Sequence, residues 1–115
     1  MLKLLAPFIV VGICLAQSNV AFADETGAAS MHSWQKVGRK TCFVDHSHSG
    51  TGEGRTKSKA RRAAIIAWRE FTAWEYGTDW ASYRHARSKA TSYTKAAKGW
   101  STSVVGRPCN PKRRK

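Results

Sequence analysis

The sequence is poor in acidic residues and in cysteine, and both shortages exclude classes of function. Seven aspartates and glutamates stand against 20 lysines and arginines in 115 residues, for a net charge of +13. The three cysteines contain no C-x-x-C pair, so nothing indicates a redox-active dithiol. The glycines stand at neither P-loop nor dinucleotide-binding spacing, which argues against the common nucleotide-binding motifs.

The sequence has one long apolar run, at its start, and this run predicts a secretory signal peptide. It extends from Leu4 to Ala16, behind a positive charge at Lys3 and ahead of the small-x-small pattern at 21–23. Because the run is too short to span a membrane, we expect cleavage after Ala23 and a periplasmic or secreted protein without a transmembrane segment. An uncleaved membrane anchor is the alternative.

Cleavage of residues 1–23 would leave roughly 90 residues, enough for one domain with a marginal core. We expect a flexible N-terminal tail at 24–32, a single small domain at 33–110 and a basic C-terminal tail at 111–115. A core of this size needs a further source of stability.

The cysteines offer that stability. Cys14 would leave with the signal peptide, so Cys42 and Cys109 remain as an even pair in an oxidising compartment. Their disulfide would contribute about 4 kcal/mol by closing the loop between them.

Residues 57–77 form the only long segment with helical periodicity. Thr56 or Ser58 is a plausible N-cap, and Gly77 stands where a helix commonly ends. Three alanines near the start of the apolar face allow close approach to a sheet, and aromatic residues follow them. The predicted apolar face comprises Ala60, Ala63, Ala64, Ala67, Phe71 and Trp74, with Trp68 at its margin.

The segments on either side of the helix predict strands and loops. They are a strand at 33–45, a flexible glycine loop at 46–56, a helical turn or crossover at 79–88, and a hairpin of 88–95 with 100–105. The expected fold class is therefore α+β: one central helix on a small three-stranded antiparallel sheet in the order β-α-β-β, closed by one disulfide. We expect a monomer.

Residues 52–64, with the sequence GEGRTKSKARRAA, carry a local resemblance. This stretch resembles the last strand-to-helix junction of double-stranded-RNA-binding domains, where a helix opens with Lys-Lys-x-Ala-Lys and paired alanines. By that resemblance Lys57, Lys59 and Arg61 would meet phosphates across a groove, although Ser58 replaces the second lysine. The whole chain, through Trp68 to Trp100 and Cys109, is similar to small exported bacterial proteins of no established activity, which implies an envelope or secreted location.

The basic residues at the helix start predict a polyanion-binding surface. A helix N-terminus presents unpaired amides and a partial positive charge, and cationic side chains add to its attraction for anions. The expected partners are nucleic acid, lipopolysaccharide, acidic glycans or anionic lipid head groups. If about five phosphates were neutralised, the affinity for duplex DNA would fall with salt at a logarithmic slope near −4.5. The predicted contact residues are Arg55, Lys57, Lys59, Arg61, Arg62, Arg69, Arg84 and Arg87.

Two histidines in the glycine loop leave other functions open. In extended backbone His46 and His48 would point the same way, which permits a Zn²⁺ or Cu²⁺ site, although solvated loop histidines are the alternative and we predict no cofactor. The same pair could serve a secreted phosphodiesterase or nuclease as acid and base. A structural or stress-related envelope protein without a ligand is the third interpretation. We favour a non-enzymatic binding module.

Overall fold

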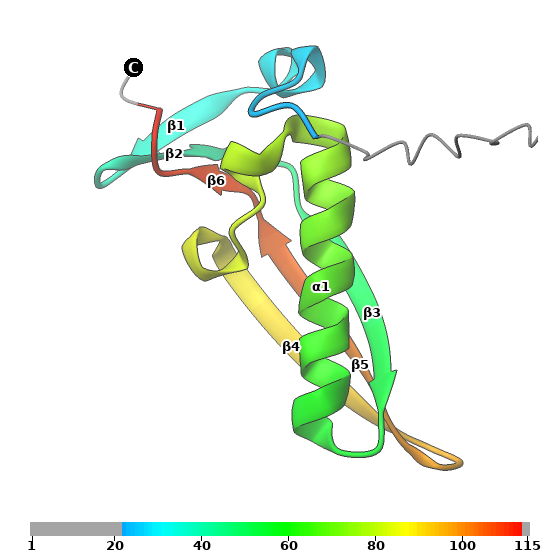
Figure 1. Ribbon diagram of the computed structural model, residues 1–115. Helices are drawn as coiled ribbons and strands as arrows, with labels where there is room; N and C mark the ends of the chain where they lie inside the picture. Colours follow the sequence, from blue (N-terminus) through cyan, green and yellow to red (C-terminus); the bar gives the residue numbers. More distant parts are fainter. Residues whose placement is uncertain (1–21, 114–115) are drawn as a thin grey trace, which may run out of the picture.

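The computed structural model describes residues 22–113, which form one α-helix and two three-stranded antiparallel sheets (Figure 1). The α+β class is confirmed. The expected signal peptide lies outside the described residues, apart from Phe22 and Ala23. The elements are η1 (Gly27–Met31), β1 (Trp34–Val37), β2 (Lys40–Phe43), β3 (His48–Gly54), α1 (Lys57–Tyr76), η2 (Thr78–Trp80), η3 (Tyr83–His85), β4 (Arg87–Ala96), β5 (Gly99–Arg107) and β6 (Cys109–Asn110), where η marks a short 3₁₀ helix.

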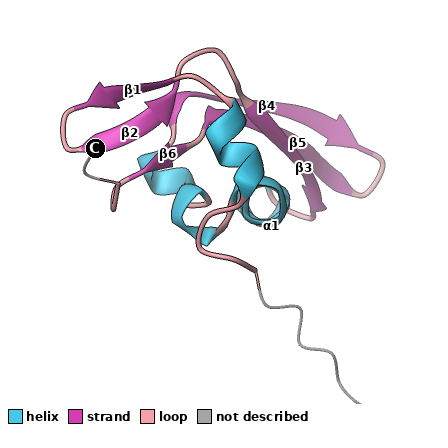
Figure 2. Cartoon of the chain, turned by 90° about the horizontal axis from the view of Figure 1, so that it is seen from above, coloured by secondary structure: helices cyan, strands magenta, loops and turns pink. Residues whose placement is uncertain are grey.

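The strands form two sheets rather than the single sheet expected. The large sheet has the order β3-β5-β4 and carries α1 on one face, whereas the small sheet has the order β1-β2-β6 (Figures 1 and 2). The strand predicted at 33–45 is a hairpin, because Gly38 adopts a left-handed φ of 62° and turns the chain back. The strand that precedes the helix is instead β3, where we expected a flexible loop.

The glycines of β3 allow the helix to lie directly against the strand. A Cβ atom at Gly52 would lie 2.3 Å from the backbone nitrogen of Ala64, and one at Gly50 would lie 2.3 Å from the carbonyl oxygen of the same residue. Alternate residues of a strand face the same side, so Gly50, Gly52 and Gly54 together form a surface without side chains. This contact explains why a glycine-rich segment is a strand here and not a linker.

Helix α1 has the predicted ends but a rotated apolar face. The Thr56 side chain accepts a hydrogen bond of 3.1 Å from the amide of Lys59, and Gly77 ends the helix with a φ of 106°. The side chains of Phe71 and Trp74, expected inside, are 45% and 68% exposed. Only small side chains fit against the glycine surface, so Ala60 and Ala64 face it. The buried face of the helix continues from these two alanines at intervals of about four residues. The buried residues are Ala60, Ala64, Trp68, Thr72, Ala73 and Tyr76.

The predicted hairpin after the helix is present as β4 and β5, joined by a turn at 97–98. The segment at 79–88, for which we left helix and crossover open, contains the short helices η2 and η3. Strand β4 is exposed over all but its last residue, so it forms an open edge of the large sheet.

The expected N-terminal tail packs against the end of α1. The amide of Thr26 donates to the carbonyl oxygen of Tyr76 at 2.9 Å, and Ala29 is fully buried. At the other terminus Arg113, expected in a solvated basic tail, donates to the Glu25 carboxylate at 2.7 Å. The N-terminal segment is therefore ordered by hydrogen bonds to the end of α1, and the C-terminal segment by the ion pair with Glu25. Neither segment shows a helical or strand period in its sequence.

Two hydrophobic clusters make up the core. The sheet cluster consists of Ala64, Trp68, Tyr83, Ala86 and Val104, between α1 and the large sheet. The aromatic cluster consists of Ala29, Phe43, Tyr76 and Trp80, at the end of α1 beside the small sheet.

The predicted disulfide between Cys42 and Cys109 is confirmed. It joins β2 to β6 across the small sheet, and its two cysteines are 67 positions apart in the sequence. Within residues 22–113, no helix combines the length and apolar character needed to cross a membrane.

Candidate functional site

The eight predicted cations do not gather at the helix N-terminus. The ammonium group of Lys57 lies 4.6 Å from the ring centroid of Trp100 and 5.3 Å from that of Tyr93, so it packs over the large sheet. Arg55 lines a hollow of about 290 Å³ that also contains the acidic residue Glu53. The side chains of Lys59 and Arg62 are exposed, and neither residue lines this hollow or the groove described next.

A different place brings cations together: a groove of about 650 Å³ along one flank of α1. Three predicted residues, Arg61, Arg69 and Arg84, line it together with Lys89. No acidic residue is among those that line it within 22–113. We call this site the basic groove; its lining residues are Arg61, Ile65, Arg69, Thr78, Ala81, Ser82, Tyr83, Arg84 and Lys89.

Helix α1 forms one wall of the basic groove. Arg61, Ile65 and Arg69 are spaced four residues apart on α1, so they follow one another along a single face of the helix. The opposite wall comes from η3 and the start of β4, which supply Arg84 and Lys89. The opposite wall keeps its position because one residue of η3 is buried in the sheet cluster.

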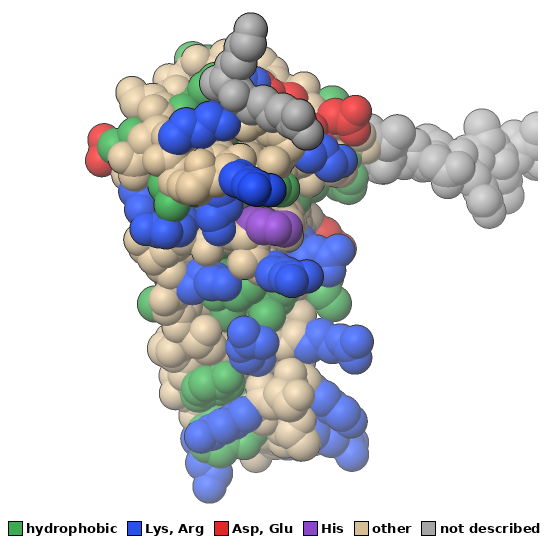
Figure 3. Space-filling model, turned by 90° about the vertical axis from the view of Figure 1, so that its left-hand side faces the viewer, with side chains coloured by type: hydrophobic (Ala, Val, Ile, Leu, Met, Phe, Trp, Pro, Cys, Tyr) green, Lys and Arg blue, Asp and Glu red, His purple; other side chains and the backbone are tan. Residues whose placement is uncertain are grey.

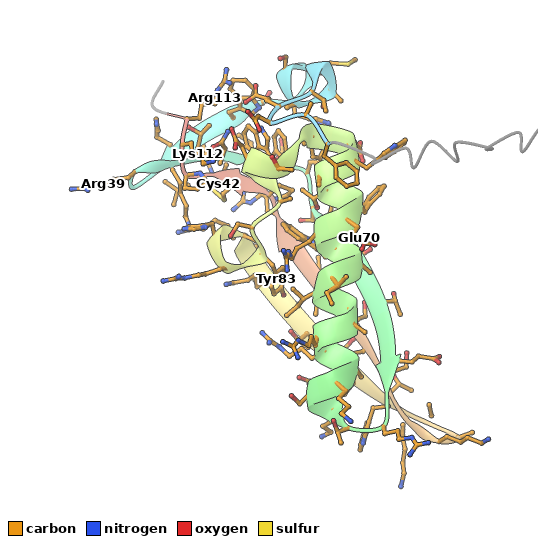
Figure 4. All side chains as sticks on the ribbon, viewed as in Figure 1. Arg39, Cys42, Glu70, Tyr83, Lys112 and Arg113 are labelled. Atoms are coloured by element: carbon orange, nitrogen blue, oxygen red, sulfur yellow. A yellow bond between two sulfur atoms is a disulfide. The ribbon has the colours of Figure 1, made fainter. Side chains whose placement is uncertain are left out.

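Tyr83 is that residue. Its ring is 6% exposed and packs edge-to-face on Trp68, with 5.2 Å between the ring centroids. The Lys89 ammonium lies 5.5 Å from the Tyr83 ring centroid and donates to the carbonyl oxygen of Arg84 at 3.3 Å. Figure 4 shows Tyr83 between η3 and α1, with Glu70 on the opposite side of the helix. Glu70 is not among the residues that line the groove, but it lines an adjoining hollow of about 310 Å³ together with Arg69, Thr78 and Ala81.

Positive charge continues beyond the groove to the small sheet. The Lys40 ammonium donates to the carbonyl oxygen of His85 at 2.7 Å. Burial, and then the charges of Arg87 and Lys89, lower the pKa of Lys40, so these three cations are close enough to repel one another. Figure 3 shows this side of the molecule, where lysine and arginine side chains run along its length and acidic ones lie at the upper end and margins.

The site therefore differs in part from the prediction. Arg61, Arg69 and Arg84 share the groove and Arg87 extends it, whereas the other four predicted residues do not line it. Sequence reasoning missed Lys89 and Lys40. The high density of cations at 84–89 was a sequence signal that could have indicated Lys89. The orientation of the Lys89 side chain, however, depends on the irregular pairing of β4 with β5 between Arg87 and Ala90, which the sequence does not reveal.

The two histidines of the predicted loop have different surroundings. His48 is 3% exposed, and its Nδ1 lies 2.9 Å from the Thr72 hydroxyl. Its Nε2 lies 3.3 Å from Oε2 of Glu75, an ion-pair distance, but in an orientation that completes no hydrogen bond. Burial lowers the pKa of His48 to about 4, against the opposing charge of Glu75, so the ring is neutral at pH 7. A ring this buried cannot reach a phosphodiester in solution. His46 is partly exposed and stacks on His32.

Comparison with known proteins finds no family model, curated protein or solved structure that matches this chain. The two sequence resemblances therefore stay predictions. The basic groove has to be interpreted from its own geometry and charge.

Proposed function

We propose that this protein is an exported polyanion-binding module whose contact surface is the basic groove. One observation carries the proposal: Arg61, Arg69, Arg84 and Lys89 line one groove that has no acidic residue among its described lining. Arginine guanidinium groups bind phosphate and sulfate groups through paired hydrogen bonds, which makes such a groove suited to those anions.

The cations of the groove have no carboxylate partner among residues 22–113. Within 22–113, ion pairs join His48 to Glu75, Lys112 to Asp79 and Arg113 to Glu25, and none involves a groove residue. Like charges in one groove repel one another and raise the local positive potential. An anion bound between them would relieve that repulsion, so the arrangement favours an anionic ligand.

The shape of the site favours a polymer over a small anion. The groove is open, and Arg61 and Arg69 stand two helical turns apart, which corresponds to about 12 Å along α1. Arg87 and Lys40 extend the positive charge past the end of the groove. A small anion would be held better by a closed pocket that buries most of its surface. A chain of phosphate or sulfate groups can use successive cations.

The test is a salt-dependent binding panel over duplex DNA, single-stranded RNA, lipopolysaccharide, heparin and anionic vesicles. If the four groove cations neutralise four phosphates of duplex DNA, the logarithmic salt slope should be near −3.6. The Arg61→Gln/Arg84→Gln variant should weaken binding and make this slope shallower by about 1.8. The panel also identifies which class of polyanion binds most tightly.

The matched control removes the same charge elsewhere. Arg39 lies at the tip of the β1–β2 hairpin, as Figure 4 shows, and Lys95 lies near the far end of β4. The Arg39→Gln/Lys95→Gln variant should retain most of the affinity. Equal losses in both double variants would indicate attraction by net charge without a focused site. Negligible binding to every member of the panel would overturn the proposal in favour of an envelope protein without a polyanion ligand.

A further inference from the structure

Three side chains with metal-binding atoms meet at the C-terminal end of α1, away from the basic groove. Potential ligand atoms of His32, His46 and Glu75 all lie within 4.8 Å of one another. All three side chains are partly buried. Two imidazoles and a carboxylate are a common ligand set for Zn²⁺, and the same set binds Cu²⁺.

The fold brings these residues together from three separate segments. His32 follows η1, His46 lies between β2 and β3, and Glu75 is in the last turn of α1 (Figure 1). The rings of His32 and His46 are stacked with 4.6 Å between their centroids. The Thr26 hydroxyl donates to the backbone carbonyl of Glu75, which fastens the segment before η1 to the helix end. The arrangement thus depends on the packed N-terminal segment.

We propose that His32, His46 and Glu75 bind a divalent transition-metal ion, Zn²⁺ or Cu²⁺. Three protein ligands leave a fourth position of a tetrahedral ion open. A cavity of about 240 Å³ lies beside His32 and His46 and is also lined by Met31, Ser33 and Asp45. Water can reach the open position from this cavity.

The charges around Glu75 support a cation at this place. Among the described residues no lysine or arginine pairs with the Glu75 carboxylate, whose only ion-pair contact is His48. Its side chain is 29% exposed and stands among aromatic and imidazole rings. A partly buried carboxylate without a positive partner is costly, and a metal ion would supply the missing charge.

Two neighbouring groups fit the outer shell of a metal site. The Tyr76 hydroxyl lies 3.0 Å from Nε2 of His32, a contact that orients the ring. His48 is 3% exposed, and its Nε2 has no hydrogen-bond partner although it faces Oε2 of Glu75 at 3.3 Å. When a metal ion takes one oxygen of Glu75, the other remains to accept from His48. Metal-binding residues are commonly held by such partners.

The experiment titrates Zn²⁺ and Cu²⁺ separately into the EDTA-treated protein, by calorimetry. We expect one ion per chain and a rise in melting temperature on metal addition. His46→Gln and Glu75→Gln should each weaken binding at least about tenfold and abolish the thermal shift. Retained affinity in both variants would overturn the proposal, as would failure of the unaltered protein to bind either ion at one per chain.

The matched controls make the same two substitutions, His→Gln and Glu→Gln, at residues outside the proposed metal site. His85→Gln changes a histidine that bonds to Ser82, and Glu70→Gln changes an exposed carboxylate on the same helix as Glu75. Both should bind metal as the unaltered protein does. If a ligand variant fails to fold, the visible spectrum of Co²⁺ bound to the unaltered protein decides. Bands of a tetrahedral Co²⁺ ion with nitrogen and oxygen ligands are expected, and an octahedral, hydrated spectrum would overturn the proposal.

Discussion

The two halves of the molecule handle charge differently. The large-sheet region, made of α1 on β3, β5 and β4, holds the basic groove with cations that have no carboxylate partner among the described residues. The aromatic region, made of η1, η2, the small sheet and the last turn of α1 with the chain segments beside them, contains two of the three ion pairs found there. The third joins Glu75, in the last turn of α1, to His48 at the start of β3. Five of the seven acidic residues of the chain lie in or beside the aromatic region: Asp24, Glu25, Asp45, Glu75 and Asp79.

This separation shows why net charge alone is a poor guide to the site. Arg113 is paired with Glu25 at 2.7 Å and Lys112 with Asp79 at 3.2 Å, so each of these two cations has a carboxylate partner nearby. The cations of the basic groove have no such carboxylate partner among the described residues. A polyanion would therefore meet an attractive surface on one half and a mixed surface on the other.

The two regions also differ in how they pack. In the large-sheet region the backbones of β3 and α1 lie close together, because glycines face alanines. In the aromatic region large rings fill the space: Phe43 stacks on Trp80 with 4.3 Å between ring centroids, and lies 4.6 Å from the Tyr76 ring. The first contact tolerates no added atom, whereas the second depends on side-chain volume and on the disulfide.

The largest effect is expected where a side chain is added to the glycine surface. The variant Gly52→Val would place a Cβ 2.3 Å from the backbone nitrogen of Ala64, and neither backbone can move without breaking its own hydrogen bonds. We expect the free energy of unfolding to fall by more than about 4 kcal/mol, measured by urea denaturation. Thr51→Val, on the exposed side of the same strand, should change it by less than about 0.5 kcal/mol. Similar values for the two variants would contradict the close contact.

Loss of the disulfide should lower the stability slightly less, and it should affect the small sheet more than the large one. Reduction of the Cys42–Cys109 bond should lower the free energy of unfolding by about 4 kcal/mol. Because the bond lies within the small sheet, amide hydrogen exchange should accelerate in β1, β2 and β6 before it does in α1 and β5. The Cys42→Ser/Cys109→Ser variant should match the reduced protein. Equal acceleration across both sheets would show that the regions unfold as one unit.

Acid should destabilise the protein through His48. Its pKa is lowered from 6.5 to about 4 in the folded state, chiefly by burial. As the pH falls below 6.5 the unfolded chain takes up a proton at this ring and the folded chain does not, so stability present above pH 6.5 is lost toward pH 4. The expected loss is about 3 kcal/mol, measured by urea denaturation between pH 7 and pH 4 with EDTA present.

Variants separate this contribution from those of nearby groups. The charges of Glu75, His46 and His32 act on the pKa of His48, so the relevant readout is the difference between matched proteins. His48→Gln should flatten the pH dependence by the stated amount, whereas His85→Gln should leave it unchanged. An unaltered slope in His48→Gln would show that other groups dominate the acid response.

The sequence predicted the features that depend on local chemistry. Helix α1 with its caps at Thr56 and Gly77, the β4–β5 hairpin and the disulfide follow from capping preferences, alternation and cysteine pairing. It did not predict β3, because three alternating glycines are typical of loops and become a strand only when a helix packs on them. Helical periodicity alone could not fix the rotation of α1, which the glycines of a separate strand determine.

The candidate sites show the same limit. Spacing places Arg61 and Arg69 on one helical face, but only the path of residues 78–89 brings Arg84 and Lys89 opposite them. The rings of the predicted histidine pair lie 5.1 Å apart between their centroids, but only His46 belongs to the three-residue cluster, for a similar reason. His48 faces the core from β3, and His46 meets His32 and Glu75, which belong to two other segments.

The smallest expected effect tests whether Lys57 belongs to the large-sheet packing or to a binding surface. Its ammonium group lies 4.6 Å from the Trp100 ring centroid, a cation–π contact worth about 0.5–1 kcal/mol at a partly exposed site. Lys57→Gln should therefore lower the free energy of unfolding by that amount and leave polyanion affinity nearly unchanged. Lys59→Gln, two residues along the helix and exposed, should change neither quantity. Polyanion affinity is measured in the same salt-dependent titration. A marked loss of affinity in either variant would show that the polyanion contacts the start of α1, as the sequence predicted, and not the basic groove alone.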